Sequence, residues 1–124
     1  MLIRIYNMNL KPNELLKLFS DPTRLRSLML LMQEGELCVC ELTYALGVIQ
    51  PKISRHLASL RDAGIVLDQR AGQWIYYRIN PDLPDWAGSV LEATLKGMRY
   101  DKQFKDDLKK LAGMPKRPDK KICA

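Results

Sequence analysis

The chain has 124 residues, of which 47% are hydrophobic, and it carries a formal net charge of +6. This length and composition correspond to one domain with a modest core. The sequence has no apolar run of about 18 residues that could cross a membrane, and its start is too short and too polar for a signal peptide. We therefore expect a cytoplasmic protein without a membrane partner.

Positive charge is concentrated in two segments. Residues 50–80 hold five Lys or Arg against two Asp or Glu, and residues 96–124 hold ten against four. Basic segments attract phosphate because binding releases condensed counterions, although many basic proteins bind no nucleic acid. The distribution favours DNA or RNA as a partner but does not establish it.

Residues 1–12 alternate only loosely between apolar and polar side chains, and we treat them as an N-terminal arm. A short helix is predicted over residues 13–19. Asp21 can cap a second helix that has Pro22 at its first position and ends at Gly35.

Two further helices form a predicted helix-turn-helix. The first covers about residues 39–46 and ends at Gly47. The second is capped by Gln50, has Pro51 at its first position and ends before Gly64. Two short helices joined by a glycine-containing turn are typical of this DNA-binding motif.

After Gly64 the pattern changes to the alternation of β-strands. Residues 65–70 and 73–79 are rich in β-branched and aromatic side chains, and Ala71-Gly72 separates them. A helix-turn-helix followed by a hairpin is a winged helix, so the expected fold class is mainly α with a β-hairpin wing.

Apolar positions at helical spacing then predict one long helix from Asp85 to about Leu111. Such a helix is too long for one small domain to cover, so we expect a partner to pack against it. The DNA-binding and dimerisation domain is thus predicted over residues 13–111. Residues 112–124 are predicted as a flexible basic tail.

The helix that begins at Pro51 has two chemically different faces. Ile53, Leu57 and Leu60 fall in one narrow arc, which should face the core. The opposite face is polar and basic, and in a winged helix such a face enters the major groove. We predict DNA contacts from this helix and from the hairpin tip, at Gln50, Lys52, Ser54, Arg55, His56, Ser59, Arg70 and Gln73.

Within this set, Arg55 is suited to guanine and Gln50 to adenine. His56, the only histidine, lies between the two faces, so we expect it to pack against protein or to contact phosphate rather than to bind a metal. The alternative for the whole face is an ordinary solvated helix surface. The order of the helix-turn-helix and the hairpin favours DNA.

Three cysteines are present, Cys38, Cys40 and Cys123, and an odd number argues against a disulfide framework. A helix N-terminus stabilises thiolates, and thiolates suit soft ions. Residues i and i+2 point about 200° apart on a helix, so binding one ion through Cys38 and Cys40 should unwind the first turn. The alternative is two small, half-buried apolar residues.

Five segments of the sequence resemble the ArsR/SmtB family of winged-helix regulators, and its arsenical-resistance members most closely. They are residues 20–25 (SDPTRL), 36–42 (ELCVCEL), 50–57 (QPKISRHL), 60–66 (LRDAGIV) and 72–78 (GQWIYYR). The resemblance implies a homodimeric repressor that holds double-stranded operator DNA and releases it on binding arsenite or antimonite. It implies Cys38 and Cys40 as ligands and no organic cofactor. It also implies a dimer seam made by the first helix and the last long one.

The sequence departs from the arsenical-resistance pattern at one ligand position. The enterobacterial members have a third Cys where this chain has Thr43, a poor ligand for arsenic. The third ligand could be Cys123, a small cellular thiol, or nothing. Zinc-sensing relatives carry His ligands on the last helix, which has none here, so a zinc sensor is disfavoured.

Two other functions compete with metalloid sensing. The same thiols could respond to oxidants or other thiophiles in a DNA-binding repressor. A thiol oxidoreductase is supported by the Cys pair alone. The sequence shows no phosphate loop, no Ser/His/Asp set and no paired catalytic carboxylates, so we do not expect an enzyme.

Overall fold

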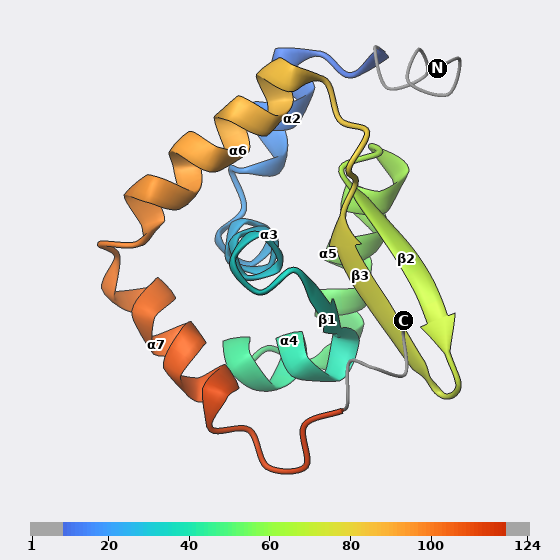
Figure 1. The fold of residues 1–124 in the computed structure, drawn as a ribbon, viewed down its shortest axis with the longest axis vertical. Helices are drawn as coiled ribbons and strands as arrows, with labels where there is room; N and C mark the ends of the chain where they lie inside the picture. The colour runs from blue at the N-terminus through green and yellow to red at the C-terminus, as the bar shows by residue number, and fades with distance from the viewer. Residues whose placement is uncertain (1–8, 119–124) are drawn as a thin grey trace.

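The computed structural model describes residues 9–118; arm residues 1–8 and tail residues 119–124, with Cys123, lie outside the described residues. The elements are α2 (Pro12–Leu18), α3 (Pro22–Glu34), β1 (Glu36–Cys38), α4 (Val39–Leu46), α5 (Gln50–Asp62), β2 (Val66–Ala71), β3 (Trp74–Ile79), α6 (Asp85–Met98) and α7 (Lys102–Ala112). This order confirms the predicted fold class, a mainly α winged helix-turn-helix with a β-hairpin wing (Figure 1).

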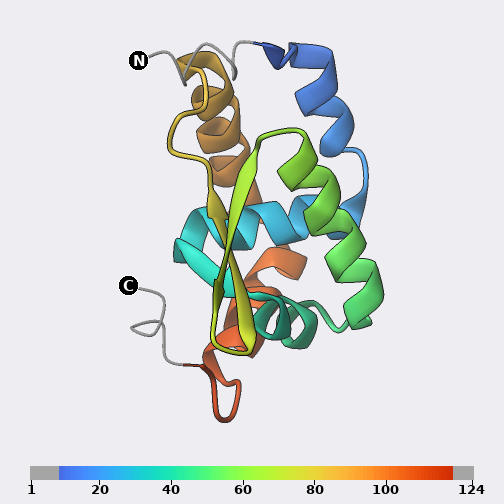
Figure 2. The same cartoon turned by 90° about the vertical axis from the view of Figure 1, so that its right-hand side faces the viewer.

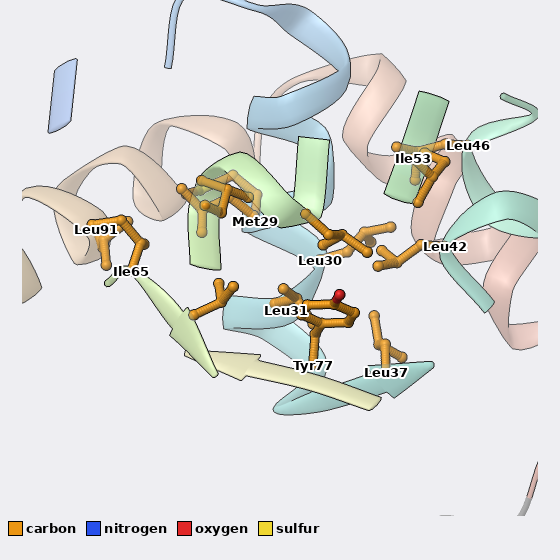
Figure 3. Close-up of a cluster of buried hydrophobic side chains, with 14 of the residues drawn as sticks. Met29, Leu30, Leu31, Leu37, Leu42, Leu46, Ile53, Ile65, Tyr77 and Leu91 are labelled. Carbon is orange, nitrogen blue, oxygen red and sulfur yellow. The ribbon is translucent and has the colours of Figure 1, made fainter. Parts of the chain in front are cut away.

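Helix α3 lies at the centre of the molecule, surrounded by the other elements (Figure 1). It begins where predicted, because the side chain of Asp21 accepts a hydrogen bond of 2.9 Å from the N–H of Arg24. It ends at Gly35, whose φ of 92° few other residues adopt. Residues 28–31 are fully buried, so this helix is covered on nearly every side. Figure 3 shows apolar side chains from α4, α5, α6 and the sheet gathered around it.

The helix-turn-helix consists of α4 and α5. Gly47 ends α4 in the left-handed conformation, with φ of 67°, as its position in the sequence predicts. The expectation that Gln50 caps α5 is wrong by one residue, because Ile49 is the N-cap and Gln50 already lies in the helix. This shift places the side chain of Gln50 on the first turn of α5.

The wing belongs to a three-stranded antiparallel sheet in the order β1-β3-β2. Strands β2 and β3 pair from Val66 opposite Ile79 to Ala71 opposite Trp74, which leaves Gly72 and Gln73 as the turn. Strand β1 was not predicted, because its three residues are too few to show an alternating pattern. It pairs with β3, so the residues that lead into α4 are attached to the wing.

The single long helix predicted over residues 85–111 is wrong, because the chain breaks after Met98 and restarts as α7. Asp101 is the cause: its side chain accepts a hydrogen bond of 3.0 Å from the N–H of Phe104 and caps α7. Helix α6 packs on α3 and α7 packs on α4, so each apolar face is covered within the same chain. The argument that length alone demands a partner therefore fails, and the homodimer stays a prediction.

Within residues 9–118 no helix has the length and apolar character needed to span a membrane.

The central position of α3 makes a direct prediction for stability. Leu30 is fully buried, so Leu30→Ala should lower the free energy of unfolding by about 2–5 kcal/mol, because it removes packed atoms and leaves a cavity. Urea denaturation followed by circular dichroism measures this change. Lys105 on α7 is exposed, and Lys105→Ala should cost less than about 0.5 kcal/mol. Equal costs for the two variants would contradict the placement of α3.

Candidate DNA-binding face and thiol site

Helix α5 has the two faces that its sequence predicts. Ile53, Leu57 and Leu60 are fully buried against the core. The predicted contact residues are distributed over the rest of the helix, with Gln50, Lys52 and Arg55 exposed and Ser54 and Ser59 partly exposed. A hydrogen bond of 2.6 Å from Gln50 Nε2 to Ser54 Oγ links two of them across one turn. The outer face therefore offers hydrogen-bonding and cationic groups together.

His56 is placed differently from the other predicted contact residues. Its side chain is 12% exposed, and Nε2 lies 3.2 Å from Oδ2 of Asp21, the N-cap of α3. Burial lowers the pKa of His56, and the attraction of Asp21 offsets only part of this effect. This contact agrees with one of the two roles expected from the sequence, which was packing against protein. The ring contacts the start of α3, and its contact with DNA stays a prediction.

The hairpin tip lies at the same end of the molecule as the start of α5 (Figure 2). Arg70 near the end of β2 and Gln73 in the turn are both exposed, as predicted. A groove of about 740 Å³ separates α5 from β3, with Gln50 on one side and Gln73 on the other. The structure thus places the helix and the wing as two arms beside one groove.

Cys38 and Cys40 lie where β1 meets α4. Cys38 ends β1 and is the N-cap of α4, with extended backbone angles (φ −85°, ψ 164°), and Cys40 is in the first turn. The two sulfur atoms are joined as a disulfide, although the cysteine count argued for free thiols. The expectation that one ion could reach both only by unwinding α4 is wrong, because Cys38 stands outside the helix. Both sulfur atoms can therefore approach one point.

The two cysteines differ in exposure. Cys38 is fully buried beside Tyr76, whereas Cys40 is partly exposed and lines the groove between α5 and β3. Thr43, which stands at the family's third ligand position, lines the same groove. Its Oγ1 is buried and has no hydrogen-bond partner within residues 9–118. An incoming ligand would thus reach the pair from the Cys40 side.

A third ligand is not found near the pair in the described part of the chain. No group of three His, Cys, Asp or Glu side chains there is placed to hold one ion. Cys123, the predicted candidate for the third position, lies outside the described residues.

Glu41 is a buried residue next to the thiol pair that the sequence reasoning did not single out. It is fully buried, and its Oε1 accepts a hydrogen bond of 2.8 Å from the backbone N–H of Cys38. Its other oxygen accepts a hydrogen bond from Nε of Arg117, and the Nη2 of Arg117 donates to Glu34 Oε1 at 3.1 Å. A Glu three residues after an N-cap is a known capping arrangement, which is the signal that could have identified it.

Arg117 belongs to the segment predicted as a flexible tail. Burial by itself would lower the pKa of Arg117, but its hydrogen bonds to Glu41 and Glu34 outweigh that effect and raise the pKa. Residues 113–118 are thus attached to the first turn of α4 through this guanidinium. We call the contact between Arg117, Glu41 and Glu34 the C-terminal clasp.

Comparisons with known proteins agree with this geometry. Residues 21–67 match the model of the family described as bacterial regulatory protein, arsR family. The arsenic resistance transcriptional regulator ArsR1 of Pseudomonas putida is 49% identical over 118 residues, which is 93% of this chain and 89% of the relative. The arsenical resistance operon repressor of Escherichia coli is 49% identical over 83 residues, covering 67% of this chain and 71% of the relative.

Solved structures show the same fold. The AntR antimony-specific transcriptional repressor superposes with a TM-score of 0.58 and 34% sequence identity, over 72% of this chain and 78% of the AntR chain. The likeness extends beyond α5 and the wing to most of the described elements.

The C-terminal clasp predicts a stability effect far along the sequence from the core. Arg117→Ala leaves the buried carboxylate of Glu41 without its cation, and breaking a buried ion pair in this way should cost about 3 kcal/mol. Urea denaturation of the reduced protein measures the loss. In the double variant Arg117→Ala/Glu41→Gln the buried charge is absent, so part of the loss should be recovered. Lys116→Ala is the control on the exposed neighbour, and a loss no larger than in that control would show that the clasp does not stabilise the fold.

Proposed function

Because this chain belongs to the arsR family of bacterial regulatory proteins, as its 49% identity to a relative over 93% of its length establishes, we propose that it is a repressor whose operator is released when arsenite or antimonite binds Cys38 and Cys40. The family acts by DNA-binding repression. What we propose for this chain is the signal that it senses and the two cysteines that bind it. One observation carries it: both sulfur atoms meet at the start of α4, the first helix of the helix-turn-helix.

In the DNA-bound state α5 lies in the major groove with its first turns at the base edges. Arg55 is the residue for a guanine, because its guanidinium forms two parallel hydrogen bonds to O6 and N7. Gln50 is suited to an adenine, and Lys52, Ser54 and Ser59 contact base edges or phosphates. The exposed side chains of Arg70 and Gln73 reach the flanking backbone from the wing.

The sensing step needs the reduced pair. Arsenite enters as As(OH)₃, and each As–S bond replaces one As–OH bond while the thiol proton leaves with the hydroxide as water. Two such exchanges on Cys38 and Cys40 give a dithiolate with one remaining As–OH bond. Thiolates are the ligands that soft ions prefer, and the start of α4 favours their charge. Cys123 or an external thiol is the proposed replacement for that last hydroxide.

The link from the ion to the DNA follows from the packing of α4. An arsenic atom bonded to both sulfur atoms must lie between them, so it separates the residue that ends β1 from the first turn of α4. Helix α4 packs on α5, and β1 pairs with β3 of the wing. Metalloid binding therefore changes the angle between α5 and the wing, and a ligand that favours this state releases the DNA.

We further propose that the repressor is a homodimer, since a two-fold operator presents two half-sites one helical turn apart. Helices α2 and α6 lie at the same end of the molecule in both views and would form the seam (Figures 1 and 2). This end lies away from the wing tip.

The disulfide favours a second candidate function, a repressor that responds to oxidants through the same pair. In this case a peroxide accepts two electrons and two protons from the thiols, the S–S bond forms, and two water molecules leave. The two candidates share the DNA-binding half and differ only in the signal.

The role of the thiol pair predicts which cysteine variants arsenite can release from DNA. The reduced protein is bound to a labelled duplex that it has selected from a random-sequence library, and arsenite is added while fluorescence anisotropy reports release. Cys38→Ser and Cys40→Ser should each bind the duplex as the wild type does. Arsenite should not release either variant, because one remaining thiolate cannot bind arsenic through two sulfur atoms. Cys123→Ser tests the third ligand: a large loss of arsenite affinity would implicate the tail, whereas no change would favour a two-thiolate site or an external thiol. Release of both variants by arsenite would place the site elsewhere, and release of the wild type by peroxide alone would favour the redox function.

The proposed role of α5 in reading DNA predicts the effect of removing Arg55. Arg55→Ala should weaken binding to the selected duplex by about 1–3 kcal/mol, roughly 5- to 150-fold, and should leave the fold intact. Arg99→Ala removes another exposed arginine, beyond the end of α6, and should have little effect. Binding of the Arg55 variant at wild-type strength would mean that another helix reads the DNA.

A further inference from the structure

Helix α7 is fastened to the helix-turn-helix through one buried carboxylate. Asp107 is 1% exposed and accepts hydrogen bonds from Arg26 Nε at 2.9 Å and Nη2 at 2.8 Å. The same Nη2 donates to the carbonyl oxygen of Leu46, the last residue of α4, at 3.2 Å. The hydrogen bonds to Asp107 raise the pKa of Arg26 although burial opposes them. One guanidinium thus joins α3, α7 and the end of α4.

This anchoring places a lysine of α7 over the helix-turn-helix turn. The Nζ of Lys110 lies 5.5 Å from the centre of the Tyr44 ring, within the range of a cation–π interaction. The same Nζ also lies beside Gly47, the residue that ends α4. It is 3.7 Å from the position that a Cβ atom on Gly47 would occupy. The lysine is exposed, and no carboxylate within residues 9–118 forms an ion pair with it.

The position of this ammonium group suits a phosphate. When α5 enters the major groove, the helix before it crosses the sugar–phosphate backbone. Lys110 stands at the end of that preceding helix and at the turn leading into α5. A lysine ammonium is a compact point charge that binds phosphate without reading sequence. Contact with the Tyr44 ring holds the flexible side chain in place before DNA arrives.

We propose that the end of α7 is a third DNA-binding arm beside α5 and the wing, in which Lys110 binds a backbone phosphate next to the helix-turn-helix turn. The inference rests on the docking of α5 proposed above. It gives a DNA contact to one residue of the basic segment 96–124, which lies outside the helix-turn-helix and the wing.

The salt dependence of DNA binding tests this phosphate contact. Each contact contributes about one unit to the slope of the logarithm of the DNA association constant against the logarithm of salt concentration. Lys110→Gln should reduce that slope by about 1 for each protomer bound, and it should do so equally for the selected duplex and for an unrelated one. Lys102→Gln is the matched control: it removes the same charge from the other end of α7, where Lys102 pairs with Asp106. Lys110→Arg keeps the charge and should keep the slope.

An equal slope for Lys110→Gln and Lys102→Gln would overturn the inference. Arg55→Ala is measured alongside to separate two failures. If it weakens specific binding while Lys110→Gln matches its control, the helix docks as proposed and only the arm is wrong. If neither variant changes binding, the proposed docking of α5 in the major groove is wrong, and so is the phosphate contact of Lys110 that depends on it. Urea denaturation of each variant establishes that the fold is intact.

Discussion

The structure depends on one junction, where β1 ends and α4 begins at the same residue. Cys38 is opposite Tyr76 in the pairing of β1 with β3, so it is part of the wing sheet. It is also the N-cap of α4, so it is part of the helix-turn-helix. Any bond made by its sulfur atom therefore acts on the helix-turn-helix and on the wing at once. A thiol placed one turn further along α4 would lack the attachment to the sheet.

Two guanidinium groups hold α4, one at each end, and each comes from a distant part of the chain. At the start, Arg117 pairs with Glu41, whose other oxygen bonds the N–H of Cys38. At the end, Arg26 joins Asp107 of α7 to the carbonyl of Leu46. Both carboxylates are buried, so each is costly to leave unpaired. Helix α4 is thus restrained by ion pairs at both ends. Under the proposed function, a metalloid that separated the thiols would work against the clasp at the first end.

The sequence predicted the parts of the fold that local chemistry determines. Asp21, Gly35 and Gly47 mark helix ends by capping and by positive φ, and these boundaries are confirmed. The buried arc of α5 follows from helical spacing alone. The split between α6 and α7 was missed because apolar residues recur at helical spacing on both sides of the break, while Asp101 acts as a cap only once the chain turns.

The thiol site was predicted in its residues but not in its geometry. Spacing in the sequence identifies Cys38 and Cys40, but the 200° argument assumed that both belong to α4. The strand that removes Cys38 from the helix is only three residues long and exists because it pairs with β3, about 40 residues later in the chain. Glu41 and Arg117 depend in the same way on tertiary contact, since a charged pair 76 residues apart leaves no local pattern.

The shared thiol pair makes the two candidate signals mutually exclusive. In the disulfide neither sulfur atom has a thiolate to offer, so an oxidised chain cannot bind arsenite, and an arsenic-bound chain has no free thiol for a peroxide. The two products also differ in shape, because the disulfide holds the sulfur atoms in direct contact and the metalloid holds them apart. Under the proposed function, only the second product would separate β1 from the first turn of α4. The metalloid would then be the signal that moves the wing against α5, and the redox state of the pair would decide whether the chain can respond.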